Sequence, residues 1–194
     1  MYYRIGMVYA PRSLQLEPAN YGFQVSRTYA PAGKDDASNV VFDEKDKVWR
    51  VKLGERVKIT VKMITTARRY HVALVDYLPA GLEPLNPALK GSPKGDDEDT
   101  SAGGRGGSGP RRGRYYRNPY TSRYYSKRYW PEHINLRDER AEAFRSLLWP
   151  GIYEFVYTAR ATTAGEFVVP PAKAEEMYSP ELFGRSATEK FVVS

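Results

Sequence analysis

Cysteine is absent from this chain, and other residues suited to reactive sites are scarce. The absence of cysteine excludes disulfides, cysteine-based metal sites and any thiol nucleophile. Only two histidines occur, His71 and His133, and their separation fits neither a two-ligand metal spacing nor a nucleophile motif. We therefore expect no catalytic residue, no metal site and no cofactor, and we interpret both histidines as structural.

Long apolar runs are also absent. A helix that spans a membrane needs about 20 consecutive apolar residues, and nothing here approaches that length. The N-terminus lacks the charged-then-apolar order of a signal peptide and begins at once with a strand-like segment, Tyr2 to Tyr9. We expect that the true start of the protein lies upstream.

The net charge of +7 comes from one segment rather than from the whole chain. Residues 101–130 hold eight basic groups and no acidic group, which leaves −1 for the remainder. The acidic run Asp96–Asp99 precedes them, followed by a stretch rich in glycine and serine. Such a composition cannot bury enough apolar surface to offset its ordering entropy. We expect a disordered basic insertion over residues 91–129.

The other segments alternate apolar and polar residues with the period of a β-strand. The predicted strands are 23–29, 48–53, 56–65, 151–160 and 190–193, with a further apolar run at 72–75 that suits a strand buried on both faces. Segments 48–53 and 56–65 are predicted to form a hairpin through Gly54. Because these strands recur at short spacing between Gly/Pro turns, we expect an antiparallel β-sandwich.

Two segments have a less regular pattern. Ala172 to Met177 contains helix-forming residues, follows Pro170-Pro171 and ends before Pro180, so we predict one short helix there. Asp138 to Leu148 fits a helix and a strand-turn-strand equally well, and both alternatives stay open.

The insertion offers the main candidate for direct chemistry. Arginine pairs with phosphate, and interleaved tyrosine can stack on unpaired bases. The residues that suit contact with a polyanion are Arg111, Arg112, Arg114, Tyr115, Tyr116 and Arg117. However, the neighbouring acidic run opposes such binding, and no nucleic-acid-binding fold motif accompanies it. Nucleic acid is therefore not the favoured partner. Asp96–Asp99 lacks the spacing of an EF-hand calcium loop, and Gly104–Gly109 lacks the ending of a phosphate-binding loop.

Four stretches carry a resemblance to a known family. They are Tyr2–Pro11, Tyr21–Tyr29, the run YHVALVDYLPAGLEPLN at 70–86 and the run FVVPPAKAEEMYSPELFGRS at 167–186. In this order they resemble the closing part of bacterial alpha-macroglobulins, which are large secreted or periplasmic proteins that trap proteases. The resemblance implies that residues 20–194 form a C-terminal macroglobulin-type (immunoglobulin-like) β-sandwich, and that 1–16 is the terminal strand of the preceding, thioester-associated domain.

The resemblance also implies a function. The chain would be a non-catalytic module of an endopeptidase inhibitor, extracellular or periplasmic, that contacts the upstream macroglobulin and thioester domains and meets target proteases through the whole trap. The Cys-x-Glu-Gln thioester motif is absent because the chain has no cysteine. The expected partner contacts are Lys90, Lys173, Glu175, Glu176 and Tyr178. The alternative is a free-standing β-sandwich binding module whose Arg/Tyr-rich loop binds nucleic acid or an acidic surface.

Overall fold

The computed structural model describes residues 7, 14–32, 37–86 and 130–194, and it confirms the expected all-β fold. Within these ranges the only helical element is a short 3-10 helix, Ala37–Asn39. The strands are β1 (Ala19–Tyr21), β2 (Gln24–Pro31), β3 (Val40–Asp43), β4 (Val48–Val51), β5 (Arg56–Thr65), β6 (Arg69–Tyr77), β7 (Leu82–Pro84), β8 (His133–Arg137), β9 (Arg140–Leu148), β10 (Gly151–Ala161), β11 (Gly165–Val169), β12 (Lys173–Glu176), β13 (Ser179–Arg185) and β14 (Glu189–Val193).

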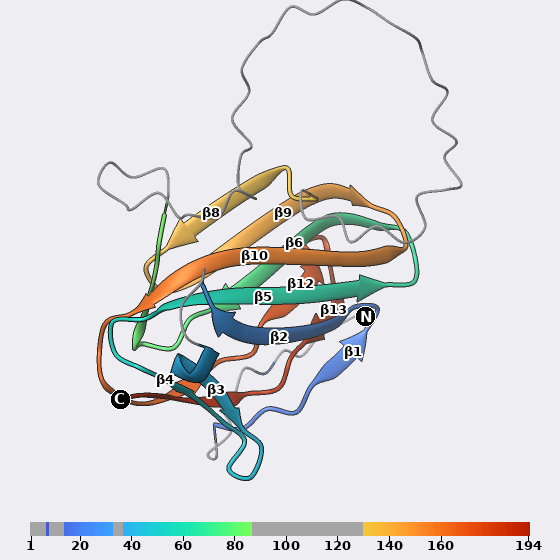
Figure 1. Cartoon of the computed structure of the whole chain (residues 1–194). Coiled ribbons are helices and arrows are strands. Elements are labelled where there is room, and N and C mark those ends of the chain that lie inside the picture. Colours follow the sequence, from blue (N-terminus) through green and yellow to red (C-terminus); the bar gives the residue numbers. More distant parts are fainter. Residues whose placement is uncertain (1–6, 8–13, 33–36, 87–129) are drawn as a thin grey trace, which may run out of the picture.

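The strands form three sheets. A six-stranded sheet has the order β1-β13-β12-β6-β9-β8, and two four-stranded sheets have the orders β2-β5-β10-β7 and β11-β14-β4-β3. In Figure 1, β5 and β10 cross the front of the molecule, β6, β12 and β13 lie behind them, and β3 and β4 lie below. Among the described strands, every pair is antiparallel except β4 and β14, which run parallel.

The core forms because β5 and β10 place every second side chain inward. In β5 the buried residues alternate strictly with half-buried ones, from Val57 to Thr65. β10 adds three large rings, Tyr153, Phe155 and Tyr157, on its buried face. The facing strands of the six-stranded sheet offer small side chains, and Ala141, Ala143 and Ala174 are 0% exposed. Large residues on one sheet thus interdigitate with small residues on the other, and each fully buried aliphatic or aromatic side chain contributes about 1.5–3 kcal/mol.

One charged cluster lies inside the core and joins all three sheets. Arg27 of β2 donates from Nη1 to Oδ1 of Asp76 in β6 at 2.6 Å, and both side chains are 1% exposed. Arg27 also donates from Nη2 and Nε to Oε2 of Glu189 in β14, at 2.9 and 3.1 Å. The hydroxyl of Tyr157 in β10 donates to Oδ2 of Asp76 at 2.7 Å. The cluster therefore fixes how the three sheets stack.

Burial and charge both shift the pKa values in this cluster. Burial alone would lower the pKa of Arg27, but Tyr29, Asp76 and Glu189 outweigh it and raise that pKa, so the guanidinium stays charged. Burial raises the pKa of Tyr157 well above its usual range, and the charge of Asp76 raises it further. Burial also raises the pKa of Tyr29, against the opposing effect of Arg27. Both phenols are therefore neutral in the folded protein.

Two predictions from the sequence need correction. The predicted helix from Ala172 to Met177 is wrong, because Lys173–Glu176 is strand β12, paired on one side with β6 and on the other with β13. The predicted hairpin through Gly54 is also wrong, because β4 pairs with β3 and β14 whereas β5 pairs with β2 and β10. The expected antiparallel sandwich is confirmed, with one parallel pair among the described strands, β4 and β14.

The ambiguous segment from Asp138 to Leu148 is resolved as a turn followed by a strand. β8 and β9 form a hairpin around residues 138 and 139, and Ala141 and Ala143 point into the core. The buried alternation of β9 explains why a strand forms here rather than a helix.

Two further predictions concern residues that are mostly outside the described ranges. The predicted disordered insertion at 91–129 lies outside them, and so do residues 1–6 and 8–13 of the predicted upstream segment 1–16. The described chain stops beyond Leu85, whose N–H donates to the carbonyl of Thr158, and resumes at Trp130, whose Nε1 donates to the carbonyl of Glu154. Both flanks of the insertion are therefore bound to β10.

Candidate functional site

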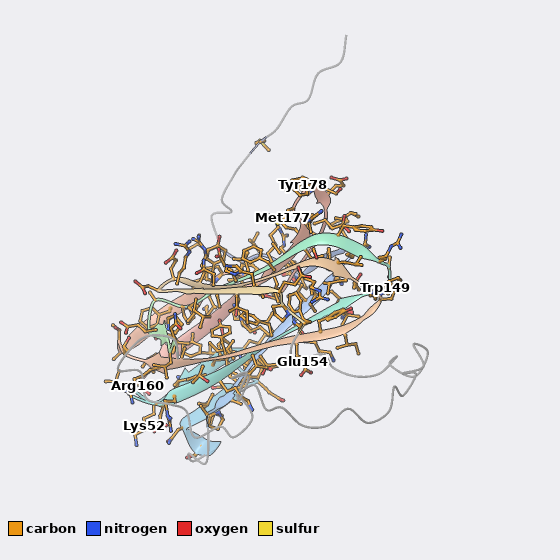
Figure 2. All side chains as sticks on the ribbon, turned by 90° about the horizontal axis from the view of Figure 1, so that it is seen from above. Lys52, Trp149, Glu154, Arg160, Met177 and Tyr178 are labelled. Atoms are coloured by element: carbon orange, nitrogen blue, oxygen red, sulfur yellow. The ribbon has the colours of Figure 1, made fainter. Side chains whose placement is uncertain are left out.

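The hairpin of β12 and β13 carries the most exposed aromatic side chain of the described strands and turns. The pairing of these strands shifts register between Glu175 and Glu176, and the turn that follows holds Met177 and Tyr178. Met177 is 52% exposed and Tyr178 is 80% exposed. Figure 2 shows both at the tip of a hairpin that projects from the ribbon. The turn thus presents two large apolar side chains to the outside.

His71 supports this turn from the neighbouring strand β6. Its carbonyl accepts a hydrogen bond from the N–H of Met177 at 2.9 Å. Its imidazole meets the ring of Tyr178 edge-on, with centroids 5.2 Å apart and planes at 87°. Its φ of 48° is left-handed, which is unusual for a residue with a side chain and costs backbone energy inside a strand. This strained conformation places the imidazole beside the turn.

A second group of rings adjoins His71 along the same end of the sandwich. The guanidinium of Arg68 lies 5.2 Å from the ring centre of Tyr70 and 5.7 Å from that of Trp149. Tyr70 is 44% exposed and Trp149 is 56% exposed. In Figure 2, Trp149 lies in the same half of the molecule as the Met177–Tyr178 turn, whereas Lys52 and Arg160 lie at the opposite end.

We call this exposed cluster the aromatic end. Its members are Arg68, Tyr70, His71, Trp149, Met177 and Tyr178.

Glu176 anchors the base of the aromatic end. Its Oε1 accepts the backbone N–H of Tyr70 at 3.1 Å and lies 4.0 Å from Nη1 of Arg69. Arg69 also donates to the carbonyl of Gly22 at 3.3 Å, so it links the β1–β2 connection to the same region. Glu176 is only 8% exposed. Its carboxylate therefore holds β12 to β6 and does not reach outward.

Glu132 precedes β8 and contacts two residues of β9. Its two oxygens accept the backbone N–H and the hydroxyl of Ser146 at 3.0 and 2.9 Å, and Arg145 lies 3.4 Å away. The hydrogen bonds from Ser146 lower the pKa of Glu132, burial opposes them, and the neighbouring Arg145 lowers this pKa further. This carboxylate is therefore ionised near neutral pH.

The predicted contact residues divide into three groups. Tyr178 belongs to the aromatic end, whereas Glu176 is buried beneath it. Lys173 and Glu175 form an ion pair on the outer face of the six-stranded sheet, where Nζ of Lys173 lies 5.6 Å from the ring centre of Phe183. Lys90 lies outside the described residues, and so do the polyanion candidates Arg111, Arg112, Arg114, Tyr115, Tyr116 and Arg117.

Sequence reasoning missed the second half of the aromatic end. Tyr70 and Trp149 flank turns, at the start of β6 and directly after β9, and neither was predicted as a contact. The sequence did contain a usable signal for Trp149, because the run Trp149-Pro150-Gly151 predicts a turn. A tryptophan in a turn is poorly buried, and Trp149 is 56% exposed. Their association depends on Arg68, which no local pattern predicts.

The described residues hold no cluster of metal-ligating side chains. Within 14–32, 37–86 and 130–194, no three His, Cys, Asp or Glu residues converge as metal ligands. None of the helices in this part of the chain has the length and apolarity needed to cross a membrane. The aromatic end is therefore the best candidate site that this part of the chain offers.

Comparisons with known proteins point to one family. The family model described as "Bacterial Alpha-2-macroglobulin MG10 domain" matches residues 22–181. An alpha-2-macroglobulin homolog of Yersinia pestis is 28% identical over 165 residues, which cover 81% of this chain and 7% of that protein. The "Circularly permutated Ras protein 2" of Dictyostelium discoideum is 30% identical over all 194 residues but is covered to only 4% of its length.

Solved structures agree on the fold. Escherichia coli alpha-2-macroglobulin activated by porcine elastase matches with a TM-score of 0.65 and 24% identity, over 92% of this chain and 14% of that one. A native fragment of the Escherichia coli protein, from domain MG7 to the C-terminus, matches with a TM-score of 0.61 and 25% identity, over 91% of this chain and 24% of the fragment. The chain thus spans a small part of each of these relatives.

Proposed function

Because this chain belongs to the bacterial alpha-2-macroglobulin MG10 domain family, we propose that it is a non-catalytic module of a protease trap. In this proposal it lies in the C-terminal part of a much longer parent protein that is extracellular or periplasmic. Its task is to contact neighbouring domains and to transmit the conformational change that follows cleavage of the trap. The match to a fragment that runs from domain MG7 to the C-terminus supports this position.

The observation that carries the proposal is the aromatic end. Tyr, Trp, Met and Arg are the residues enriched at the centre of protein interfaces, and this cluster gathers all four. Its rings are held in place by Arg68 and His71 before any partner arrives, which lowers the entropy cost of docking. The partner of this surface is a neighbouring domain of the parent, since the chain spans only 7% of its Yersinia pestis relative.

A graft into a relative tests the proposal. The full 194-residue chain replaces the matching segment of the Escherichia coli protein, and the fraction of elastase that the graft retains is compared with that of the protein lacking the segment. We expect the graft to restore retention, and Tyr178→Ala or Trp149→Ala to reduce it by about thirtyfold or more, as for a hot-spot residue worth about 2 kcal/mol or above. A graft that behaves like the protein without the segment contradicts the proposal.

Leu53→Ala provides the matched control. Leu53 is also exposed, at 48%, but it follows Lys52 at the opposite end of the sandwich. It should leave elastase retention unchanged. Tyr178→Ala should change the free energy of unfolding of the isolated chain by no more than about 0.5 kcal/mol, because an exposed side chain contributes little to folding. Equal effects of Tyr178→Ala and Leu53→Ala on retention would refute the role of the aromatic end.

A further inference from the structure

Arg68 is the permanently charged member of the aromatic end, and it lies against two rings. The carbon at the centre of its guanidinium is 5.2 Å from the ring centre of Tyr70 and 5.7 Å from that of Trp149. All three residues are exposed, and they lie at the turn before β6 or directly after β9. A guanidinium that stacks on aromatic faces keeps the N–H donors along its rim open to a partner. The two rings therefore orient the cation of Arg68 without satisfying its hydrogen bonds.

No carboxylate within residues 14–32, 37–86 and 130–194 pairs with this cation. The ion pairs of these residues involve other arginines and one lysine, and Arg68 takes part in none of them. Glu176, at the base of the aromatic end, lies 4.0 Å from Arg69 instead and accepts the backbone N–H of Tyr70. The positive charge of Arg68 is therefore balanced by solvent alone in the described part of the chain.

Docking removes that solvent. A partner that covers the rings of Tyr70 and Trp149 also covers the guanidinium that lies against both of them. Burying a charge without a partner is costly, whereas a carboxylate that accepts two parallel N–H bonds from the guanidinium replaces the lost water. A surface without an acidic group at this point would therefore be rejected, because it would leave the cation of Arg68 buried and unpaired.

We propose that Arg68 binds a carboxylate of the neighbouring domain, an aspartate or glutamate side chain that meets the rim of the guanidinium beside Tyr70 and Trp149. This inference rests on the proposed function and names the chemistry of the partner. The exposed rings supply apolar contact area, which alone fixes no unique orientation. The forked ion pair adds that orientation, because both oxygens of the carboxylate must lie in the plane of the guanidinium.

Acetate is a simple carboxylate probe for this site, and sodium chloride at equal ionic strength is its control. The indole N–H signals of the three tryptophans are followed by NMR in the full 194-residue chain. We expect the Trp149 signal to shift with acetate and to reach half of its full shift at roughly 10–100 mM, as for one charged hydrogen bond. The signal of Trp130, whose Nε1 donates to the carbonyl of Glu154, should stay in place. Arg68→Met should abolish the Trp149 shift, whereas Arg50→Met, at a pair with Asp43 and Asp46, should keep it.

In the grafted Escherichia coli protein, Arg68→Met should lower elastase retention by about tenfold or more, and Arg50→Met should leave it unchanged. Equal responses of Trp149 to acetate and chloride, or full retention in Arg68→Met, overturn the inference. A response to inorganic phosphate without one to acetate also overturns it, and would indicate a phosphorylated partner. The proposed function fails separately, if Tyr178→Ala has no effect on retention, because the acetate experiment uses this chain alone.

Discussion

The buried cluster around Arg27 leads to a sharp prediction about stability. Arg27→Met keeps the length of the side chain but leaves Asp76, which is 1% exposed, without its cation. Removing one partner of a buried ion pair costs about 3–5 kcal/mol, because the remaining charge stays buried and unpaired. At this chain length each kcal/mol lowers the midpoint of thermal unfolding by roughly 2–4 °C. We therefore expect the midpoint to fall by roughly 6–20 °C.

Differential scanning calorimetry and urea unfolding measure this loss, and Arg50→Met is the control. Arg50 pairs with Asp43 and Asp46 at 3.4 and 3.3 Å, but its side chain is 50% exposed. An exposed pair of this kind contributes at most about 1 kcal/mol. If Arg27→Met does not fold, Arg27→Lys keeps the charge but loses the forked contact with Glu189, and should give an intermediate loss. Equal, small losses in Arg27→Met and Arg50→Met would refute the reasoning.

The remaining predictions concern single buried or turn positions. Gly184→Ala should cost roughly 1–3 kcal/mol or more in urea unfolding, because its Cβ would lie 2.1 Å from the carbonyl oxygen of Phe23. At Gly54 an added Cβ would meet no atom within 4 Å, but the backbone φ of +86° disfavours a side chain, so Gly54→Ala should cost about 1 kcal/mol. A larger loss of stability at Gly54 than at Gly184 would contradict both expectations. Trp130→Ala should cost about 3–5 kcal/mol, since this side chain is 2% exposed, and a loss below about 1 kcal/mol would show that the site collapses freely. The pKa of Tyr157 is raised, so the stability it contributes is complete below the ordinary tyrosine pKa of about 10 and declines as the pH rises above it. Tyrosinate absorbance should then increase together with unfolding, and Tyr157 ionising in a protein that stays folded would argue against its burial.

Strands with strict alternation could be predicted from the sequence. The pattern at 56–65 coincides with β5, and the segment 151–160 with nearly all of β10, because each strand buries one face and exposes the other. The partners of the strands could not be predicted in the same way. Gly54 indicated a local hairpin between β4 and β5. Instead, β4 pairs with β14, which is about 140 residues away in the sequence, and with β3. The outcome depends on contacts far apart in the sequence, which local patterns do not contain.

The segment around β12 shows how tertiary pairing overrides local preference. Ala, Lys, Glu and Met all favour helices, so the propensity of 172–177 indicated a helix. In the fold, Ala174 packs at 0% exposure between β6 and β13, and a helix would remove both ladders. The weaker signal in the sequence was the alternation of charged and small apolar residues at Lys173 and Ala174. This alternation matches the exposed and buried faces of β12.

The candidate site was predictable only in part. Tyr178 was expected at a contact because the resemblance drew attention to its segment, and that contact stays a prediction for a side chain that is 80% exposed. Tyr70 and Trp149 are brought together by the cation of Arg68, and Tyr178 lies against His71, whose backbone is left-handed. Neither the contacts of Arg68 nor the left-handed φ of His71 can be predicted from a periodic pattern in the sequence.

The parallel pairing of β4 with β14 has a consequence for how the chain acquires its fold. Among the described strands β14 is synthesised last, yet it lies between β11 and β4 and provides Glu189 for the buried cluster. Its neighbour Ser194 also exchanges hydrogen bonds with Val51 and Leu53. Contacts of such long sequence separation form slowly, because the intervening chain must first be ordered. During translation the sheet β11-β14-β4-β3 therefore stays incomplete until β14 has been synthesised. Until then the unpaired edge of β4 is exposed to other chains.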